Sequence, residues 1–185
     1  MPPDAARRSD RSRRAILAAA LELLEERGYA KVTVEAVAAR AGVGKQTIYR
    51  WWQAKGPLLF DAFIESRAVG WEVRPWGELG ADLKLELREA IAEVGERRFD
   101  QVCRALVHEA RTDLVALLLT PRRVVLEQRL AAAQRDGDVR GDVDVAAAAE
   151  LLLGPVYQRW LLRTGPLTGA FSDRVVDLAL RALLG

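Results

Sequence analysis

Polar and basic side chains cluster in a short segment near the N-terminus of this 185-residue chain. The segment follows Gly42 and Gly44, and it holds Lys45, Gln46, Thr47, Tyr49 and Arg50. Side chains of these types donate hydrogen bonds to phosphate oxygens and to base edges in a major groove. The chemistry expected of the segment is therefore recognition of a nucleic acid, without a covalent step.

Charge is unevenly distributed along the chain. Residues 1–55 carry eleven Lys and Arg against six Asp and Glu, a net charge of +5, whereas residues 56–185 carry a net charge of −3. The formal charge of +2 for the whole chain hides this difference. A basic segment favours a polyanionic partner, although a solvated basic surface explains the same charge.

Few residues are suited to catalysis or metal binding. The chain has one Cys, Cys103, and one His, His108, and in a helix their five-residue spacing turns them to different faces. The aspartates of residues 136–144 lack the spacing of a calcium loop and are interpreted as a solvated turn. We therefore expect no metal, no cofactor and no enzymatic activity.

The pattern of apolar residues predicts an all-α fold, since the two-residue alternation of strands is absent. Thr33 is expected to cap a short second helix that Gly42 ends, Thr120 and Pro121 to start another, and Ser172 to cap the last. A break is expected over residues 71–80. The other expected helices are 10–27, 44–52, 57–70, 81–95, 98–110, 112–119, 121–136 and 143–163.

Residues 33–52 have the pattern of a helix-turn-helix. Val37 is expected to face inward from the first helix, Gly42 to supply a left-handed turn without a Cβ penalty, and Val43 and Ile48 to anchor the second helix. The polar side chains that follow Gly44 are then left to point outward, where a short helix fits the major groove.

Residues 10–60 resemble the DNA-binding domain of the TetR family of transcriptional regulators. The resemblance rests on Arg14-Ala-Ile-Leu-Ala-Ala-Ala through Leu24, Gly28-Tyr29, Thr33-Val34-Glu35-Ala36-Val37-Ala38, Ala41 to Trp52, Lys55 and Leu58-Leu59. It implies a three-helix helix-turn-helix DNA-binding domain with a basic N-terminal arm over residues 1–60. It also implies a helical ligand-binding and dimerisation domain over residues 61–185.

The resemblance implies a set of DNA-contacting residues: Thr33, Gly44, Lys45, Gln46, Thr47, Tyr49, Arg50, Trp51 and Lys55. Gln46 and Lys45 are expected to meet bases or phosphates, and Thr47, Tyr49 and Lys55 to meet phosphates. Trp52 is expected in the core, whereas Trp51 either packs or touches DNA. The arginines of residues 7–14 either contact DNA or form a solvated terminus.

The resemblance also implies that the last two long helices, 143–163 and 172–184, pair with a second copy. Both helices are apolar over a broad face, which favours a partner. An inducer pocket for a small-molecule effector is expected between helices of the second domain, although the same side chains fit an ordinary core or dimer interface. The candidate lining residues are Phe99, Cys103, Val107, Leu118, Leu126, Tyr157 and Trp160.

These expectations describe a ligand-responsive repressor that acts as a homodimer on a palindromic operator in double-stranded DNA. The alternative is a nonspecific or architectural DNA-binding protein, against which the acidic, apolar second segment argues. The apolar runs are too short to span a membrane and no secretory signal is recognised, so a cytoplasmic protein without a membrane partner is expected.

Overall fold

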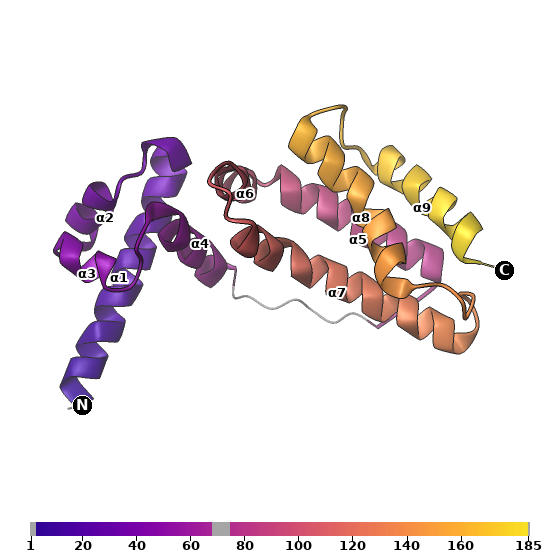
Figure 1. The fold of residues 1–185 in the computed structure, drawn as a ribbon, viewed down its shortest axis with the longest axis horizontal. Helices are drawn as coiled ribbons and strands as arrows, with labels where there is room; N and C mark the ends of the chain where they lie inside the picture. Colours follow the sequence, from indigo (N-terminus) through magenta and orange to yellow (C-terminus); the bar gives the residue numbers. More distant parts are fainter. Residues whose placement is uncertain (1–2, 68–74, 185) are drawn as a thin grey trace. The chain divides into compact units, whose positions relative to one another are not determined.

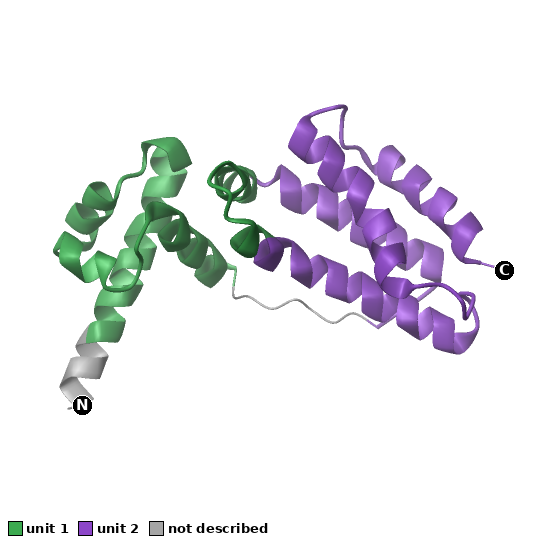
Figure 2. Cartoon of the chain, viewed as in Figure 1, with its two compact units in different colours: residues 1–71, 97–115 green, residues 72–96, 116–185 purple. Residues whose placement is uncertain are grey.

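The computed structural model describes residues 3–67 and 75–184, with side chains from Ser9 onward. Within these ranges the chain forms α-helices, one short 3₁₀ turn and connecting loops, and no strand, which confirms the expected all-α fold (Figure 1). The chain divides into two compact units, residues 1–71 with 97–115 and residues 72–96 with 116–185 (Figure 2).

The first unit is built on the long helix α1. Its elements are α1 (Pro3–Arg27), η1 (Tyr29–Lys31), α2 (Val34–Ala41), α3 (Lys45–Tyr49), α4 (Lys55–Ser66) and α6 (Arg97–His108). Helix α1 packs against α2 and α4, and α4 packs against α6. Ile16, Leu23 and Leu24 are buried on one face of α1, because residues seven and eight positions apart share a side of a helix.

Helix α6 contributes to the core of this first unit. The ring of Phe99 packs edge-on against the ring of Phe63 from α4, with centroids 6.1 Å apart. Both rings are fully buried, as are Leu58 and Leu59 of α4. A segment that is remote in sequence therefore completes the hydrophobic support of the helix-turn-helix.

The second unit consists of α5 (Leu79–Gly95), α8 (Val145–Leu162), α9 (Gly169–Leu183) and most of α7 (Thr112–Asp136). Helix α5 packs against both α8 and α9, which also pack against each other. Its core is aliphatic, with Leu83, Leu87, Leu126, Leu152 and Val156 fully buried.

A buried arginine joins α7 to α5 in the second unit. The Nη1 of Arg122 donates to Glu86 at 2.9 Å and to Glu89 at 3.0 Å, and its Nε donates to Glu93 at 3.4 Å. Burial by itself lowers the pKa of the Arg122 guanidinium, but the charge of Glu93 and the bonds to Glu89 and Glu86 outweigh it and raise that pKa.

The expected helix start at Thr120 and Pro121 is wrong, because α7 runs without interruption from Thr112 to Asp136. Leu118, Arg122 and Leu126 are all buried and lie four residues apart, so one inward face continues across the proline. Burial of that face outweighs the loss of the proline N–H, which costs an isolated helix about 3 kcal/mol. Thr120 lies inside the helix, and its hydroxyl donates to the carbonyl of Ala116 at 2.7 Å.

The starts of the first and last helices also differ from the prediction. Helix α1 begins at Pro3 rather than at residue 10. Helix α9 begins at Gly169, and its cap is Thr168, whose hydroxyl accepts from the N–H of Phe171 at 3.2 Å. Ser172, the expected cap, is buried in the first turn of α9 and donates to the carbonyl of Gly169.

The bounds of α3 and α4 also differ from the prediction. Helix α3 covers Lys45–Tyr49, and Trp52 follows it after a turn. Helix α4 begins at Lys55 and ends at Ser66. The expected end near Gly70 and the first part of the expected break, residues 71–74, lie outside the described residues.

Candidate nucleic-acid interface

Helix α2 is fixed at both ends by the residues expected to do so. The hydroxyl of Thr33 accepts a hydrogen bond from the N–H of Ala36 at 3.2 Å, which caps the helix. Gly42 ends it in the left-handed conformation, with φ 65° and ψ 33°. Val37 and Ala38 are buried between these ends, so the helix has one inward face.

The turn between α2 and α3 sets which side of α3 faces outward. The N–H of Val43 donates to the carbonyl of Ala38 at 3.0 Å, and Gly44 precedes α3 in an extended conformation. Ile48 is fully buried and is the only buried side chain of α3. The remaining face of α3 therefore presents three exposed side chains, Lys45, Gln46 and Tyr49, with Thr47 half-buried and Arg50 exposed just after the helix.

An acidic side chain lies beside the first residue of α3. The Nζ of Lys45 donates to Glu35 of α2 at 3.0 Å, and both side chains are more than half exposed. The pKa of the Glu35 carboxyl is lowered first by its own backbone N–H and then by Lys45. The sequence analysis missed this pair, because no local spacing rule links residues ten positions apart across a turn.

Helix α2 is tied to α1 by an arginine. The guanidinium of Arg40 donates through Nη1 to Glu22 at 3.2 Å and through both Nη atoms to Glu26 at 2.9 Å. Such bidentate pairs fix direction as well as distance. The orientation of α2, and of the α3 that follows it, is therefore set from α1 by a surface bond as well as by the core.

The two tryptophans after α3 have different surroundings. Trp52 is 4% exposed and its Nε1 donates to Asp61 of α4 at 2.8 Å, which confirms the expectation that it belongs to the core. Trp51 is 41% exposed, and its ring lies 6.2 Å from the ring of Trp52 at a tilt of 38°. Trp51 thus packs on its neighbour while keeping an open face, so its contact with DNA stays a prediction.

Lys55 begins α4 and is held by the 3₁₀ turn η1. Its Nζ donates to the carbonyl of Tyr29 at 3.1 Å and lies 4.5 Å from the centre of the Tyr29 ring. The Tyr29 hydroxyl donates to Glu109 at 2.7 Å. Burial and this bond to Glu109 raise the pKa of the Tyr29 hydroxyl well above its ordinary value. In this structure the Lys55 ammonium contacts the carbonyl and the ring of Tyr29, and its expected contact with a DNA phosphate stays a prediction.

The basic N-terminal segment continues α1 as a helix from Pro3. The side chains of Arg7 and Arg8 lie outside those described, whereas Arg11 and Arg14 are exposed. Arg13 points to α4, and its Nη1 donates to Glu65 at 2.9 Å.

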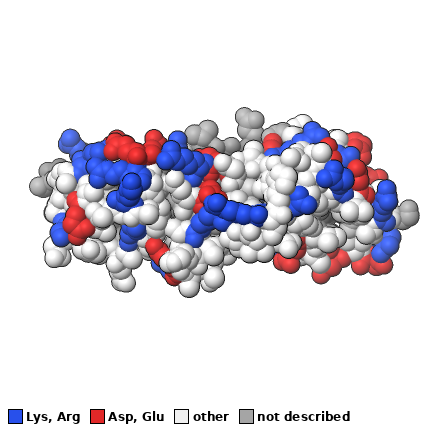
Figure 3. Space-filling model, turned by 90° about the horizontal axis from the view of Figure 1, so that it is seen from above, with Lys and Arg blue, Asp and Glu red and all other residues white. Residues whose placement is uncertain are grey.

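The positive charge of residues 1–55 is partly compensated inside the first unit. Arg13, Arg40 and Lys45 each form an ion pair with a carboxylate of the same unit. On the face drawn in Figure 3, basic and acidic side chains both lie over each unit. The electrostatic attraction for a polyanion is therefore weaker than the number of eleven Lys and Arg residues by itself indicates.

The candidate residues for an inducer pocket do not form one group. Phe99 and Cys103 are buried in the first unit, and Val107 of the same unit is 39% exposed. Leu118, Leu126 and Trp160 are buried side chains of the second unit, which makes them part of its core. Tyr157 is the one candidate that lines the pocket described next.

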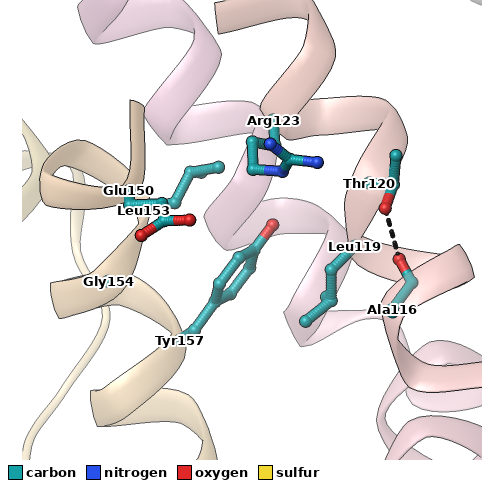
Figure 4. A pocket seen from close by; sticks show the side chains of 8 residues that line it. All are labelled: Ala116, Leu119, Thr120, Arg123, Glu150, Leu153, Gly154 and Tyr157. Atoms are coloured by element: carbon teal, nitrogen blue, oxygen red, sulfur yellow. Dashed lines mark hydrogen bonds between the residues drawn. The ribbon is translucent and has the colours of Figure 1, made fainter. Parts of the chain in front are cut away.

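A pocket of about 590 Å³ lies between α7 and α8 of the second unit (Figure 4). It is lined by apolar and polar residues: Ala116, Leu119, Thr120, Arg123, Glu150, Leu153, Gly154 and Tyr157.

Among the described residues, no group of three or more His, Cys, Asp or Glu side chains is placed to hold a metal ion. In the same residues, no helix combines the length and the apolar content needed to cross a bilayer.

Two family models match the chain. One, for bacterial regulatory proteins of the tetR family, covers residues 16–62 and so contains α2, the turn and α3. The other, for the C-terminal domain of proteins similar to the tetracyclin repressor, covers residues 73–179.

Relatives match over nearly the full length. The chain is 30% identical over 190 aligned residues to the uncharacterised HTH-type transcriptional regulator YdeS of Bacillus subtilis, covering 96% of this chain and 91% of YdeS. It is 31% identical to the DNA-binding transcriptional repressor TetR of Mycobacteroides abscessus, covering 92% of each. The crystal structure of the TetR family regulator SCO0332 superposes with a TM-score of 0.73 at 31% identity, over 94% of this chain and 99% of that one.

The capped α2, the left-handed Gly42 turn and the exposed face of α3 form the helix-turn-helix expected for DNA binding. With both family models and the full-length relatives in agreement, the chain belongs to the TetR family of DNA-binding transcriptional regulators.

Proposed function

We propose that this regulator is a ligand-responsive repressor that binds a palindromic operator as a homodimer. The observation that carries the proposal is the α3 segment, in which one buried residue, Ile48, supports an otherwise outward-facing surface of polar side chains. Such a helix reads base edges, and a two-fold pair of helices reads two half-sites. The M. abscessus relative, named as a repressor, supports repression.

The dimer interface is expected on a stripe of α8 that its own unit leaves uncovered. The exposed members, spaced three or four positions apart, are Ala147, Leu151, Gly154, Gln158 and Leu162. Leu151 is 56% exposed and Leu162 is 62% exposed, and Leu178 of α9 is 66% exposed. Apolar side chains with this much exposure on two helices that pack against each other favour a protein partner.

The stripe differs from much of the apolar face that the sequence suggested for the partner. Ala148, Leu152 and Val156 of α8, with Val176 and Ala179 of α9, are buried in the core of their own unit. The residues left for a second copy lie beside them on the helix surface. A two-fold contact through such a stripe is self-complementary, as in most homodimers.

The DNA proposal is tested with full-length protein and the DNA upstream of its own gene. We expect a footprint with two-fold symmetry and an affinity well above that for shuffled DNA, since base contacts add to phosphate contacts. Gln46→Ala should relax the preference at one base position in each half-site, whereas Tyr49→Phe should weaken binding to all sequences alike. Equal affinity for operator and shuffled DNA would instead support the nonspecific DNA-binding alternative.

The dimer proposal is tested by light scattering of Leu151→Lys and Leu178→Lys together. Burying two lysines without partners opposes association, so this variant should be monomeric at micromolar concentration while keeping its helical circular dichroism spectrum. Leu117→Lys is the matched control, because Leu117 of α7 is 58% exposed but lies outside the stripe. A dimeric double variant, or a monomeric control, would contradict the assignment of the interface.

Ligand response is proposed as a shift between conformations of different operator affinity. A ligand shifts such an equilibrium only by its difference in affinity for the two states. The pocket between α7 and α8 supports this part of the proposal, since its volume lies within the range of small-molecule sites.

A further inference from the structure

The pocket between α7 and α8 combines an apolar wall with a polar cluster. Leu119 comes from α7, and Leu153 comes from α8, beside Gly154. In Figure 4 the Tyr157 ring, the Arg123 guanidinium and the Glu150 carboxylate surround one space between the two helices. A molecule that fills this space must therefore present both apolar surface and a polar group.

The charges at the pocket are not balanced. The Nη1 of Arg123 is paired with Glu127 on the next turn of α7, at 2.5 Å. Within the described part of the chain, no ion pair or hydrogen bond involves the Glu150 carboxylate. The Arg123 charge thus has a partner on its own helix, whereas the Glu150 carboxylate has none in the described residues, so Glu150 offers a cation an uncompensated negative charge.

Hydrogen-bonding capacity points in the same direction. The Thr120 hydroxyl gives its proton to the carbonyl of Ala116, so toward the pocket its oxygen offers lone pairs. The Glu150 carboxylate is an acceptor only, and the Tyr157 hydroxyl oxygen is able to accept as well. A group with several N–H donors and a positive charge suits this set of acceptors.

We propose that this pocket is the effector site and that it binds an amphipathic amine, with the ammonium group at Glu150 and the apolar body against Leu119 and Leu153. The proposal rests on the ligand-responsive function proposed above and names the chemical class of its ligand. Glu150 is exposed, so solvent screening limits the electrostatic part of the affinity to that of a surface ion pair.

The test uses the full-length protein and three probes that share an indole ring: tryptamine, which is a cation, tryptophol, which is neutral, and indoleacetate, which is an anion. Isothermal titration calorimetry should give tryptamine the highest affinity and indoleacetate the lowest. Glu150→Gln should weaken tryptamine binding about fivefold, the effect of one surface ion pair, and leave tryptophol binding unchanged.

Two further variants keep the test sharp. Glu96→Gln removes the same charge from an exposed position of the second unit outside the pocket, and it should leave all three affinities unchanged. Ala116→Phe adds a ring at the exposed α7 edge of the pocket and should weaken all three probes. Equal affinities for the three probes, or a loss of tryptamine binding in Glu96→Gln, would overturn the proposal.

The same titration distinguishes a side chain of the second copy as the occupant, since Gly154 belongs both to the pocket and to the exposed stripe of α8. Binding of tryptamine to the monomeric Leu151→Lys, Leu178→Lys variant alone would identify that occupant and overturn the effector assignment.

Operator binding is measured separately, by fluorescence anisotropy with and without tryptamine. If tryptamine binds at Glu150 without changing operator affinity, the pocket is an amine site but not the effector site. That result would also count against the proposed ligand response at this pocket. If the protein binds its operator but does not bind tryptamine, the proposed DNA-binding function stands and the proposed amine site is rejected.

Discussion

Glu35 places a negative charge next to the side chain that begins the recognition helix. In the free protein it holds the Lys45 ammonium at 3.0 Å. DNA phosphates compete for the same ammonium, and a carboxylate on the same surface repels them. Glu35 therefore lowers DNA affinity, because the Lys45–Glu35 ion pair must break before Lys45 binds a phosphate.

Replacing Glu35 by Gln should raise the affinity for nonspecific DNA by about twofold to fivefold, the range expected for one surface ion pair. Fluorescence anisotropy with a random-sequence duplex at low salt measures this change. The pKa of the Glu35 carboxyl is lowered, so the group stays charged well below neutral pH and the effect should be constant from pH 6 to 8.

Glu25→Gln is the matched control for this prediction. It removes the same charge from the first unit, but its partner is Arg98 of α6 rather than a residue of α3. The two variants should differ in affinity, and an equal rise in both would mean that overall charge, not release of Lys45, is responsible.

At this scale the sequence predicted what depends on near neighbours. The Thr33 cap, the Gly42 turn and the burial of Ile48 each follow from residue type and spacing over a few positions. The pairs Lys45–Glu35 and Tyr29–Glu109 join residues that meet only after the chain has folded, so no local rule contains them.

Among the elements, η1 and α6 are joined by the hydrogen bond from Tyr29 to Glu109, at 2.7 Å. Tyr29→Phe should lower the free energy of unfolding by about 1 kcal/mol near neutral pH, because Glu109 loses its donor. Urea denaturation followed by circular dichroism measures the change.

The pH dependence of this effect has a definite sign. The pKa of the Tyr29 hydroxyl is raised in the folded protein above its ordinary value of 10.0, so the unfolded chain loses the proton first as pH rises. The stabilisation is fully present below pH 10 and declines above it. The difference between the native protein and Tyr29→Phe should therefore shrink in alkaline buffer, and a difference that grows would contradict the assignment.

Gly56 offers a second way to disturb the same bond. A Cβ at this position would lie 2.5 Å from an oxygen of Glu109, so Gly56→Ala must move that side chain. The carboxylate is at the end of a flexible side chain, so the movement itself costs little. Gly56→Ala should reproduce the alkaline behaviour of Tyr29→Phe.

Between α5 and α7, Arg122 is the central cation for three carboxylates. Arg122→Met should lower the free energy of unfolding by about 3 kcal/mol, because the buried Glu93 then lacks its compensating charge. Arg88→Met is the control, since Arg88 pairs with Asp173 at the surface and its loss should cost about 1 kcal/mol or less. Equal losses in urea denaturation would mean that burial of Arg122 adds nothing.

The helix boundaries show in which cases local sequence signals are enough to predict where a helix begins or ends. The ends of α2 were predicted because a capping hydroxyl and a left-handed glycine mark them. The start at Pro121 was predicted by the same kind of signal and was wrong, because the buried face through Leu118 and Leu126 continues past it. Tertiary burial decides such a case, and it is not visible in a window of a few residues.

For the whole molecule, the number of Lys and Arg residues in positions 1–55 is larger than the number of cations available to DNA phosphates. Several of its eleven Lys and Arg residues are paired with carboxylates of the first unit. The logarithm of the DNA-binding constant should fall linearly with the logarithm of salt concentration, with a slope of about −0.9 for each phosphate neutralised. Anisotropy titrations at several salt concentrations should give a slope corresponding to fewer than eleven phosphates per protomer.

Charge divided the sequence near residue 55, but it did not indicate that α6 would belong to the first unit. Its sequence has the amphipathic pattern of any core helix, and nothing local states that Phe99 will meet Phe63 of the first unit. The grouping of elements into units depends on contacts between distant segments.

The burial of Ile48, and of no other side chain of α3, has a consequence for protein design. Within this helix the side chain that packs in the core and the side chains that face outward are at different positions, so packing and recognition are encoded separately. A library randomised at residues 45, 46, 47, 49 and 50, with Ile48 kept, should yield mostly folded proteins with diverse target preferences. The DNA specificity of this segment can therefore change, by design or in evolution, without loss of the fold.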